Sequence, residues 1–138
     1  MLETVYDVQP EQVEPDYERM LAWFATRHRK RSLVVLFTDL VDPEINRGLT
    51  AHLAALAARH LVLAVTLTDP ALLALSRCMP TSTQETYEKA AALEVLAQRE
   101  ETRARLQRSG VLVIDVPPSS FSAAVVNQYL QIKEQGRL

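Results

Sequence analysis

Glycine is the scarcest of the structure-breaking residues in this 138-residue chain. There are three glycines, where an average usage of about 7% would supply about ten. Gly48, Gly110 and Gly136 lie far apart, so no glycine-rich loop is available to hold a phosphate group. Their spacing excludes P-loop nucleotide-binding proteins and the dinucleotide-binding fingerprint.

Cysteine and long apolar runs are also scarce. Cys78 is the single cysteine, so the chain forms no internal disulfide. The longest apolar runs have about five to seven residues, whereas a membrane-spanning helix needs roughly 18 to 20. Nothing at the N-terminus resembles a signal peptide. We therefore expect no membrane insertion by this chain and a reducing, cytoplasmic setting.

No charge of one sign dominates. The chain has 15 basic and 17 acidic side chains, a formal net charge of −2, and this balance gives no electrostatic case for nucleic acid or an anionic membrane. The hydrophobic fraction of 48% argues against wholesale disorder. A chain of this length suits one domain, residues 1–138, that buries roughly 68% of its unfolded surface.

Three short runs of apolar residues predict strands. They cover residues 33–37, 61–65 and 111–114, and they are continuously apolar rather than alternating. Strands of a parallel sheet that is covered on both faces have this pattern.

Helical patterns lie between these runs. Asp42-Pro43, Asp69-Pro70 and the similar Glu14-Pro15 combine an acidic N-cap with proline at the first helical position. We predict short and long helices over residues 71–77 and 84–108, the second ended by Gly110. Three apolar stripes at helical spacing predict the other helices: Tyr17, Met20, Leu21 and Phe24; Ile45, Leu49, Leu53, Leu56 and Ala57; Phe121, Ala124, Val125, Tyr129 and Ile132.

The predicted order of elements is helix, strand, helix, strand, helix, helix, strand, helix. This order implies right-handed parallel crossovers and hence a three-layer α/β domain, a parallel sheet of about three strands with flanking helices. Five or six strands are usual for such folds, so three is a small number.

Each predicted strand leads into an aspartate: Asp39, Asp69 and Asp115, with Asp42 three residues after the first. Ligands of open parallel sheets bind beyond the carboxyl ends of the strands, and Mg²⁺ prefers carboxylate and hydroxyl oxygens. The competing interpretation is structural: Asp42 and Asp69 as helix N-caps, and Asp115 as a turn acid before two prolines. For Asp39, a functional and a structural role are equally favoured.

The remaining candidates indicate structure rather than chemistry. Thr38 and Thr68 suit strand-end hydrogen bonds as well as they suit ligation. Ser119-Ser120 suits a helix cap, Cys78 has no second cysteine at metal-binding spacing, and His28, His52 and His60 share no such spacing either. The basic cluster Arg27–Arg31 suits a solvated helix end, and the alternative is steering of an acidic partner.

Several segments together resemble a bacterial family, domain-of-unknown-function family fifty-eight, with a von Willebrand factor A-like core. They are Glu14-Pro15-Asp16-Tyr17, the strand exit LVVLFTDLVD at 33–42, Arg59-His60-Leu61-Val62-Leu63, Thr68-Asp69-Pro70, Gly110-Val111, Asp115-Val116-Pro117-Pro118 and Val126-Asn127-Gln128-Tyr129-Leu130. The resemblance implies a partial von Willebrand factor A-like (Rossmann-like) fold, the C-terminal half of a domain with about six strands.

The resemblance also implies an incomplete metal-ion-dependent adhesion site. Asp39 matches the aspartate of the third metal loop, whereas the DxSxS loop is absent and Asp16 lies where the second-loop threonine is expected. One carboxylate binds Mg²⁺ feebly, because dehydration of this ion is costly. We expect no tightly bound cofactor here, with Mg²⁺ restricted to a complete domain.

The implied function is a non-enzymatic protein-interaction module that works with a MoxR-type AAA+ ATPase. The alternative is a metal-assisted hydrolase or phosphoryl-transfer domain that uses Asp39, Asp42 and Asp115, and a third hypothesis is a structural remnant without a partner. In the resembled topology the strand Leu33–Phe37 lies inside a larger sheet, so we expect its edge to be open here. We therefore predict a homodimer, formed by edge pairing of this strand or by exchange of a terminal helix.

Overall fold

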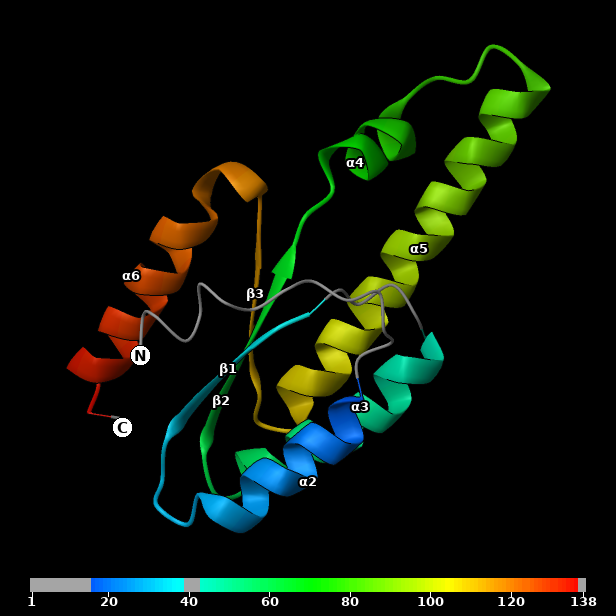
Figure 1. The fold of residues 1–138 in the computed structure, drawn as a ribbon. Coiled ribbons are helices and arrows are strands. Elements are labelled where there is room, and N and C mark those ends of the chain that lie inside the picture. Colours follow the sequence, from blue (N-terminus) through cyan, green and yellow to red (C-terminus); the bar gives the residue numbers. More distant parts are fainter. Residues whose placement is uncertain (1–15, 39–42, 137–138) are drawn as a thin grey trace, which may run out of the picture.

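A computed structural model describes residues 16–38 and 43–136 of the chain (Figure 1). Its elements follow the predicted order, with one short 3-10 turn added before the last helix. They are α2 (Tyr17–Arg27), β1 (Leu33–Phe37), α3 (Pro43–Ala57), β2 (Leu61–Leu67), α4 (Pro70–Arg77), α5 (Thr83–Arg108), β3 (Leu112–Val116), η1 (Pro118–Ser120) and α6 (Phe121–Glu134). The α/β prediction is confirmed.

The three strands form one parallel sheet in the order β1-β2-β3. Leu33 of β1 pairs with Leu61 of β2, and Leu63 of β2 pairs with Leu112 of β3. The bounds of β1 are as predicted, whereas β2 and β3 each continue two residues further than the apolar runs indicate. The ladder tolerates these polar extensions because Thr66 and Asp115 bond to each other across it.

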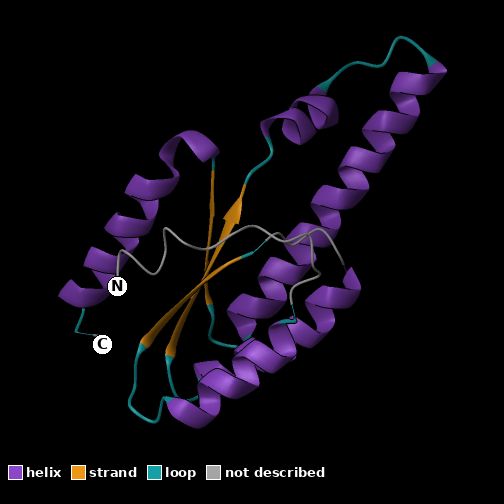
Figure 2. Cartoon of the chain, in the orientation of Figure 1, coloured by secondary structure: helices purple, strands orange, loops and turns teal. Residues whose placement is uncertain are grey.

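Helices cover the two faces of the sheet unequally (Figure 2). One face packs against α2, α3 and α5 in a cluster that contains Leu21, Leu53 and Leu106. The other face packs against α6 through Phe121, Ala124 and Val125. Three helices on one face and one on the other leave part of the sheet's apolar surface without a helix over it.

Burial follows position in the sheet. The central strand β2 is buried from its first residue to its sixth, and β1 and β3 are mostly half-buried although their composition is similarly apolar. Phe37, the last residue of β1, is 54% exposed. Residues of β1 and β3 also pack into the clusters on both faces, so the predicted two-sided coverage is present, but it is less complete in these edge strands than in β2.

In two of the predicted apolar stripes, those of α2 and α6, fewer residues are buried than the sequence pattern predicts. Leu21 is buried on α2 and Ile132 on α6, but Met20 and Tyr129 of the same stripes are exposed. A helix that packs on one neighbour buries a narrow strip, so the residues at the margin of the stripe face solvent.

The long helix α5 begins and ends with defined caps. Ser82 accepts a hydrogen bond from the Glu85 amide, and Gly110 follows the last turn with φ +88°. Glycine adopts this left-handed conformation without the steric cost that a Cβ imposes. The first part of α5 extends beyond the sheet together with α4 (Figure 1).

Among residues 16–38 and 43–136, no helix combines the length and the apolar composition that crossing a lipid bilayer requires.

Candidate functional site

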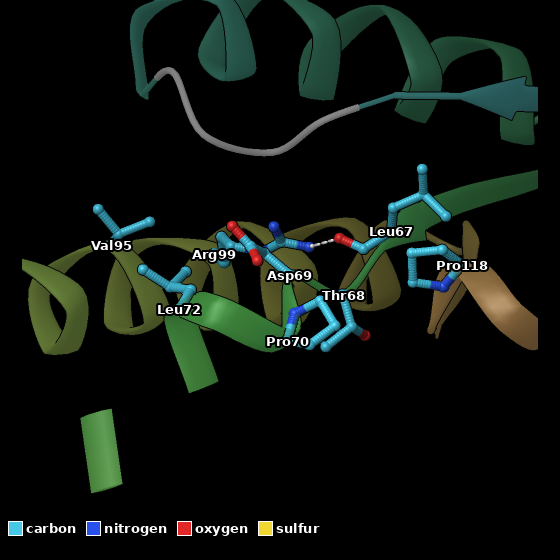
Figure 3. A pocket seen from close by; sticks show the side chains of 8 residues that line it. All are labelled: Leu67, Thr68, Asp69, Pro70, Leu72, Val95, Arg99 and Pro118. Atoms are coloured by element: carbon cyan, nitrogen blue, oxygen red, sulfur yellow. Dashed lines mark hydrogen bonds between the residues drawn. The ribbon is translucent and has the colours of Figure 1, made fainter. Parts of the chain in front are cut away.

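A cavity of about 480 Å³ opens at the carboxyl edge of the sheet, where β2 and β3 end (Figure 3). Its wall is mostly apolar and includes one buried cation, Arg99. The residues that line it are Leu67, Thr68, Asp69, Pro70, Leu72, Val95, Arg99 and Pro118. This is the edge at which open parallel sheets bind ligands. The cavity therefore lies at the end of the sheet where ligands of this fold class are expected.

Arg99 is the cation among the residues that line this cavity, and α5 supplies it. Its side chain is only 10% exposed. Its Nη2 donates to the Leu67 carbonyl oxygen at 2.8 Å and to Oδ1 of Asp115 at 3.4 Å. The guanidinium thus connects α5 to β2 and to β3. These hydrogen bonds offset the cost of burying a cation.

Asp115 lies within β3 and not in a turn, which corrects the sequence interpretation. Thr66 of the neighbouring strand is buried and donates to Oδ1 of Asp115 at 2.9 Å. The Asp115 side chain remains 38% exposed. One oxygen of this carboxylate, Oδ1, therefore already accepts from a hydroxyl and a guanidinium.

A surface ion pair lies beside this cluster. The guanidinium of Arg103 donates to both oxygens of Glu100, at 2.8 and 2.9 Å. These hydrogen bonds hold the pKa of Glu100 below its ordinary value, and the same pair raises the pKa of Arg103. With Arg99 and Asp115, it closes a small pocket of about 90 Å³ against Thr66 and Leu96.

Asp69 caps a helix, as the Asp-Pro pattern predicted. Its Oδ1 accepts from the Ala71 amide at 2.8 Å, and α4 begins at Pro70. The backbone amide of Thr68 donates to the Val116 carbonyl at 2.9 Å. These two residues shape the cavity wall.

The edge near β1 is less polar. The hydroxyls of Thr38 and Tyr17 are 3.4 Å apart, and the rings of Phe37 and Phe121 lie 5.3 Å apart between centroids. Phe37 therefore rests partly on α6, with about half of its surface open to solvent.

The predicted metal residues divide into two groups. Asp39, the residue with the strongest metal prediction, and Asp42 lie outside the described residues. Asp16 is the N-cap of α2, where its Oδ1 accepts from the Arg19 amide at 2.9 Å. Within residues 16–38 and 43–136, no three histidine, cysteine, aspartate or glutamate side chains are grouped so that they could hold a metal ion. The described residues alone do not fit a divalent cation.

The other sequence candidates lie apart from the cavity. His28 stacks on Phe24, the buried His60 meets the same ring edge-on, and Nδ1 of His52 lies 2.8 Å from the Gly48 carbonyl oxygen. Cys78 ends α4, with its thiol on the Leu75 carbonyl. Ser120 precedes α6 as its cap residue, but its side chain makes no capping hydrogen bond. Each of these contacts is structural.

Arg99 and Thr66 were not identified from the sequence. The one available signal is a seven-residue spacing: Ala92, Arg99 and Leu106 are the buried residues of α5. Two helical turns separate consecutive members, so Arg99 shares a face with two apolar residues. Among the many charged residues of α5, this spacing is the feature that distinguishes it.

Two of the polar side chains that line the cavity, Asp69 and Arg99, are hydrogen-bonded within the fold. Proton transfer or nucleophilic attack needs a base within hydrogen-bond reach of a nucleophile. Among the described residues that line the cavity, the polar groups are a capping aspartate, a threonine and an internally bonded arginine. An apolar wall of this kind accommodates a side chain or a small apolar group.

Comparison with known proteins gives a family but no activity. The family model described as "Protein of unknown function DUF58" matches residues 1–112, from the beginning of the chain to the first residue of β3. Neither a curated protein nor a solved structure matches the chain. Because the matched residues make up most of the chain, this protein belongs to the DUF58 family.

Proposed function

We propose that this chain is a non-enzymatic protein-interaction module, the C-terminal part of a von Willebrand factor A-like domain that works with a MoxR-type AAA+ ATPase. Support comes from membership of the DUF58 family, from the sequence resemblance and from the parallel three-stranded sheet. The site described above favours this function over an enzyme, since Asp115 is engaged by Arg99 and Thr66.

The observation that carries the proposal is the outer side of β1. In a parallel ladder, the N–H and C=O groups of alternate residues point to opposite sides of the strand. Thr38 N–H and the Ser32 carbonyl bond to β2, so the even-numbered residues face β2. Leu33, Val35 and Phe37 direct their backbone groups away from it, and no strand among the described residues pairs with them.

The two edge strands differ in how they resist pairing. β1 has the sequence LVVLF, with no charge, proline or bulge, and natural edge strands use such devices to prevent association. β3, in contrast, contains a charged residue, Asp115, whose side chain is 38% exposed. We therefore assign the interface to β1, and we propose a second copy of the chain as the occupant. A two-fold axis would join two β1 strands antiparallel and extend the sheet to about six strands.

The test is the oligomeric state of a proline pair. Val35→Pro removes a backbone N–H that points outward, so β1–β2 pairing is retained and edge pairing is blocked. Val113→Pro is the matched control, because Val113 is the corresponding outward-facing position of β3. By analytical ultracentrifugation at micromolar concentration, we expect dimers for the wild type and Val113→Pro and monomers for Val35→Pro.

A monomeric wild type, or a dimer that survives Val35→Pro, would contradict the interface. Circular dichroism verifies that each variant is folded. Phe37→Lys provides a second variant if proline unfolds the sheet, because it adds a charge at the half-exposed end of β1 and keeps the backbone N–H.

Magnesium titration by calorimetry separates the module from the metal-assisted enzyme. We expect weak or undetectable binding by this chain alone, because one or two carboxylates repay little of the dehydration of Mg²⁺. Micromolar affinity that Asp39→Asn abolishes would favour the enzyme instead. The proposed ATPase partnership is tested by identifying a MoxR-type ATPase in material co-purified through the tagged chain.

A further inference from the structure

Six exposed cations gather at the amino edge of the sheet, the edge at which the strands begin. They are Arg27, Arg29, Lys30, Arg31, Arg59 and Arg108, which we name the basic end. The fold collects them because α2, α3 and α5 all finish beside the start of a strand (Figure 1). Segments more than 70 residues apart in sequence thus contribute to one surface.

Within the part of the chain that the structure describes, none of these six side chains forms an ion pair. Arg27 lies over the ring of Trp23, 5.0 Å from its centroid, and Arg108 donates to the Ala104 carbonyl of its own helix. In α6, which also ends at this edge, Lys133 and Glu134 offset each other. Among residues 16–38 and 43–136, the basic end therefore carries positive charge that no ion pair offsets, in a chain whose total charge is −2.

An apolar strip adjoins this charge. Trp23 is 53% exposed and Met20, one turn earlier on α2, is 46% exposed. The buried side of the same helix is held by Leu21, so Met20 and Trp23 face away from the core. An exposed indole directly beside arginines is the combination found where proteins meet a lipid headgroup layer.

We propose that the basic end, with Trp23, docks peripherally on an anionic lipid surface. A protein surface with a cluster of four to eight lysines and arginines is attracted to anionic lipid headgroups. The indole of Trp23 then enters the headgroup layer without spanning the membrane. Low total charge does not prevent this binding, because only charges within about a Debye length of the surface contribute.

The distribution of charge also sets an orientation. At the opposite end, residues 83–95 of α5 carry Glu85, Glu88 and Glu94 against Lys89. An anionic surface repels this end and attracts the other, so the chain would bind in one direction. The cavity at the carboxyl edge then faces away from the lipid and stays open to a protein partner.

An anionic lipid surface fits better than a nucleic acid or an acidic protein segment. The cations come from three separate places, the ends of α2, α3 and α5 with the loops that follow them, and these surround the starts of the strands. A broad anionic plane engages all three at once, whereas a single strand of nucleic acid requires cations along a groove with aromatic rings that stack on bases. Trp23 is the one tryptophan of the chain and is already paired with Arg27.

This single tryptophan makes the test direct. The full 138-residue chain is mixed with vesicles of phosphatidylcholine alone or with about a third phosphatidylglycerol, and binding is measured by co-sedimentation and by tryptophan emission. We expect binding to the anionic vesicles only, a blue shift of the emission as Trp23 enters the headgroup layer, and weaker binding in high salt.

Two charge-matched variants locate the surface. Arg29→Glu/Arg31→Glu and Arg19→Glu/Arg77→Glu change the net charge equally, and the second pair lies outside the basic end. We expect the first variant to bind anionic vesicles about 30-fold more weakly and the second less than about 3-fold more weakly. Trp23→Ala should weaken binding about 5-fold to 10-fold, and Trp23→Phe should recover most of that loss.

Several outcomes would overturn the proposal. They are no binding to anionic vesicles, equal losses in the two charge-matched variants, or binding without any change in tryptophan emission. Tighter binding to polyglutamate or to a single-stranded oligonucleotide than to the vesicles would assign the basic end to a protein or nucleic-acid partner instead.

Discussion

At the carboxyl edge of the sheet, the cation Arg99 is buried and bonded to a strand carbonyl and to Asp115. At the amino edge, six cations are exposed and, among the described residues, bonded to no carboxylate. The same residue type thus serves two purposes in one domain. A buried, bonded arginine contributes to stability, whereas exposed, unpaired arginines contribute to the electric field that a partner meets.

The two edges also differ in the kind of hydrogen bond that holds them, side-chain bonds at one and main-chain bonds at the other. The carboxyl edge depends on side-chain hydrogen bonds between α5, β2 and β3. The amino edge depends on main-chain turns such as the one at Gly110, whose amide donates to the Gln107 carbonyl. Substitutions at the two edges should therefore differ in their effects on stability, and four predictions follow from the largest effect to the smallest.

Arg99→Ala should lower the free energy of unfolding by about 2–4 kcal/mol, because it removes the guanidinium donor of the Leu67 carbonyl, one of the two donors to Oδ1 of Asp115, and buried side-chain carbon. The control is Arg103→Ala, one turn later on α5, which removes a surface pair and should cost less than about 1 kcal/mol. Urea unfolding monitored by circular dichroism measures both. If the two variants lost the same free energy of unfolding, the buried Arg99 would contribute no more to stability than the surface Arg103.

Gly110→Ala should lower the free energy of unfolding by about 1–2 kcal/mol, because alanine at φ +88° meets the steric cost of the left-handed region. Contact is not the cause, since an added Cβ would lie 4.0 Å from Ala57 Cβ. Gly48→Ala, in the helix α3 with nothing within 4 Å, is the control and should be neutral or stabilising. Thermal unfolding of the two variants gives the comparison.

Arg29→Glu/Arg31→Glu should change the free energy of unfolding by no more than about 0.5 kcal/mol, because both side chains are exposed and unpaired among the described residues. The two edges would then differ in their contribution to stability. Replacing arginines at the amino edge would leave the free energy of unfolding almost unchanged, whereas replacing Arg99 at the carboxyl edge would lower it. A loss above about 1.5 kcal/mol in urea unfolding would mean that the basic end is a structural element.

Glu100→Gln should produce the smallest change, and that change should depend on pH. The folded state lowers the pKa of Glu100 through Arg103, so the pair stabilises the fold above the unfolded pKa of about 4.3. This stabilisation is lost as pH falls through the lower folded pKa. Stability curves of the variant and the wild type should therefore differ at pH 7 and converge in acid. A difference that grows in acid would contradict this assignment.

The sequence predicted the order of the elements and the parallel sheet, because strands of apolar residues and helices that begin at Asp-Pro are set by local chemistry. Asp69 as a cap and Gly110 as a helix end are examples in which one or two residues are sufficient. Asp115 was misassigned to a turn because its partners, Thr66 and Arg99, lie 49 and 16 residues away. Nothing local distinguishes a strand aspartate with such partners from a turn aspartate.

The sequence by itself determined that this chain has no glycine-rich phosphate-binding motif and no apolar run as long as a membrane-spanning helix needs. Its short apolar runs also determined where the three strands lie. Only the tertiary structure decided which arginines are buried and which are gathered at the basic end. Each arginine is the same amphipathic side chain, and its role depends on whether neighbouring elements bring it a carboxylate and a carbonyl or leave it beside other cations. Such neighbours are separated by tens of residues in the chain, so folding alone brings them together.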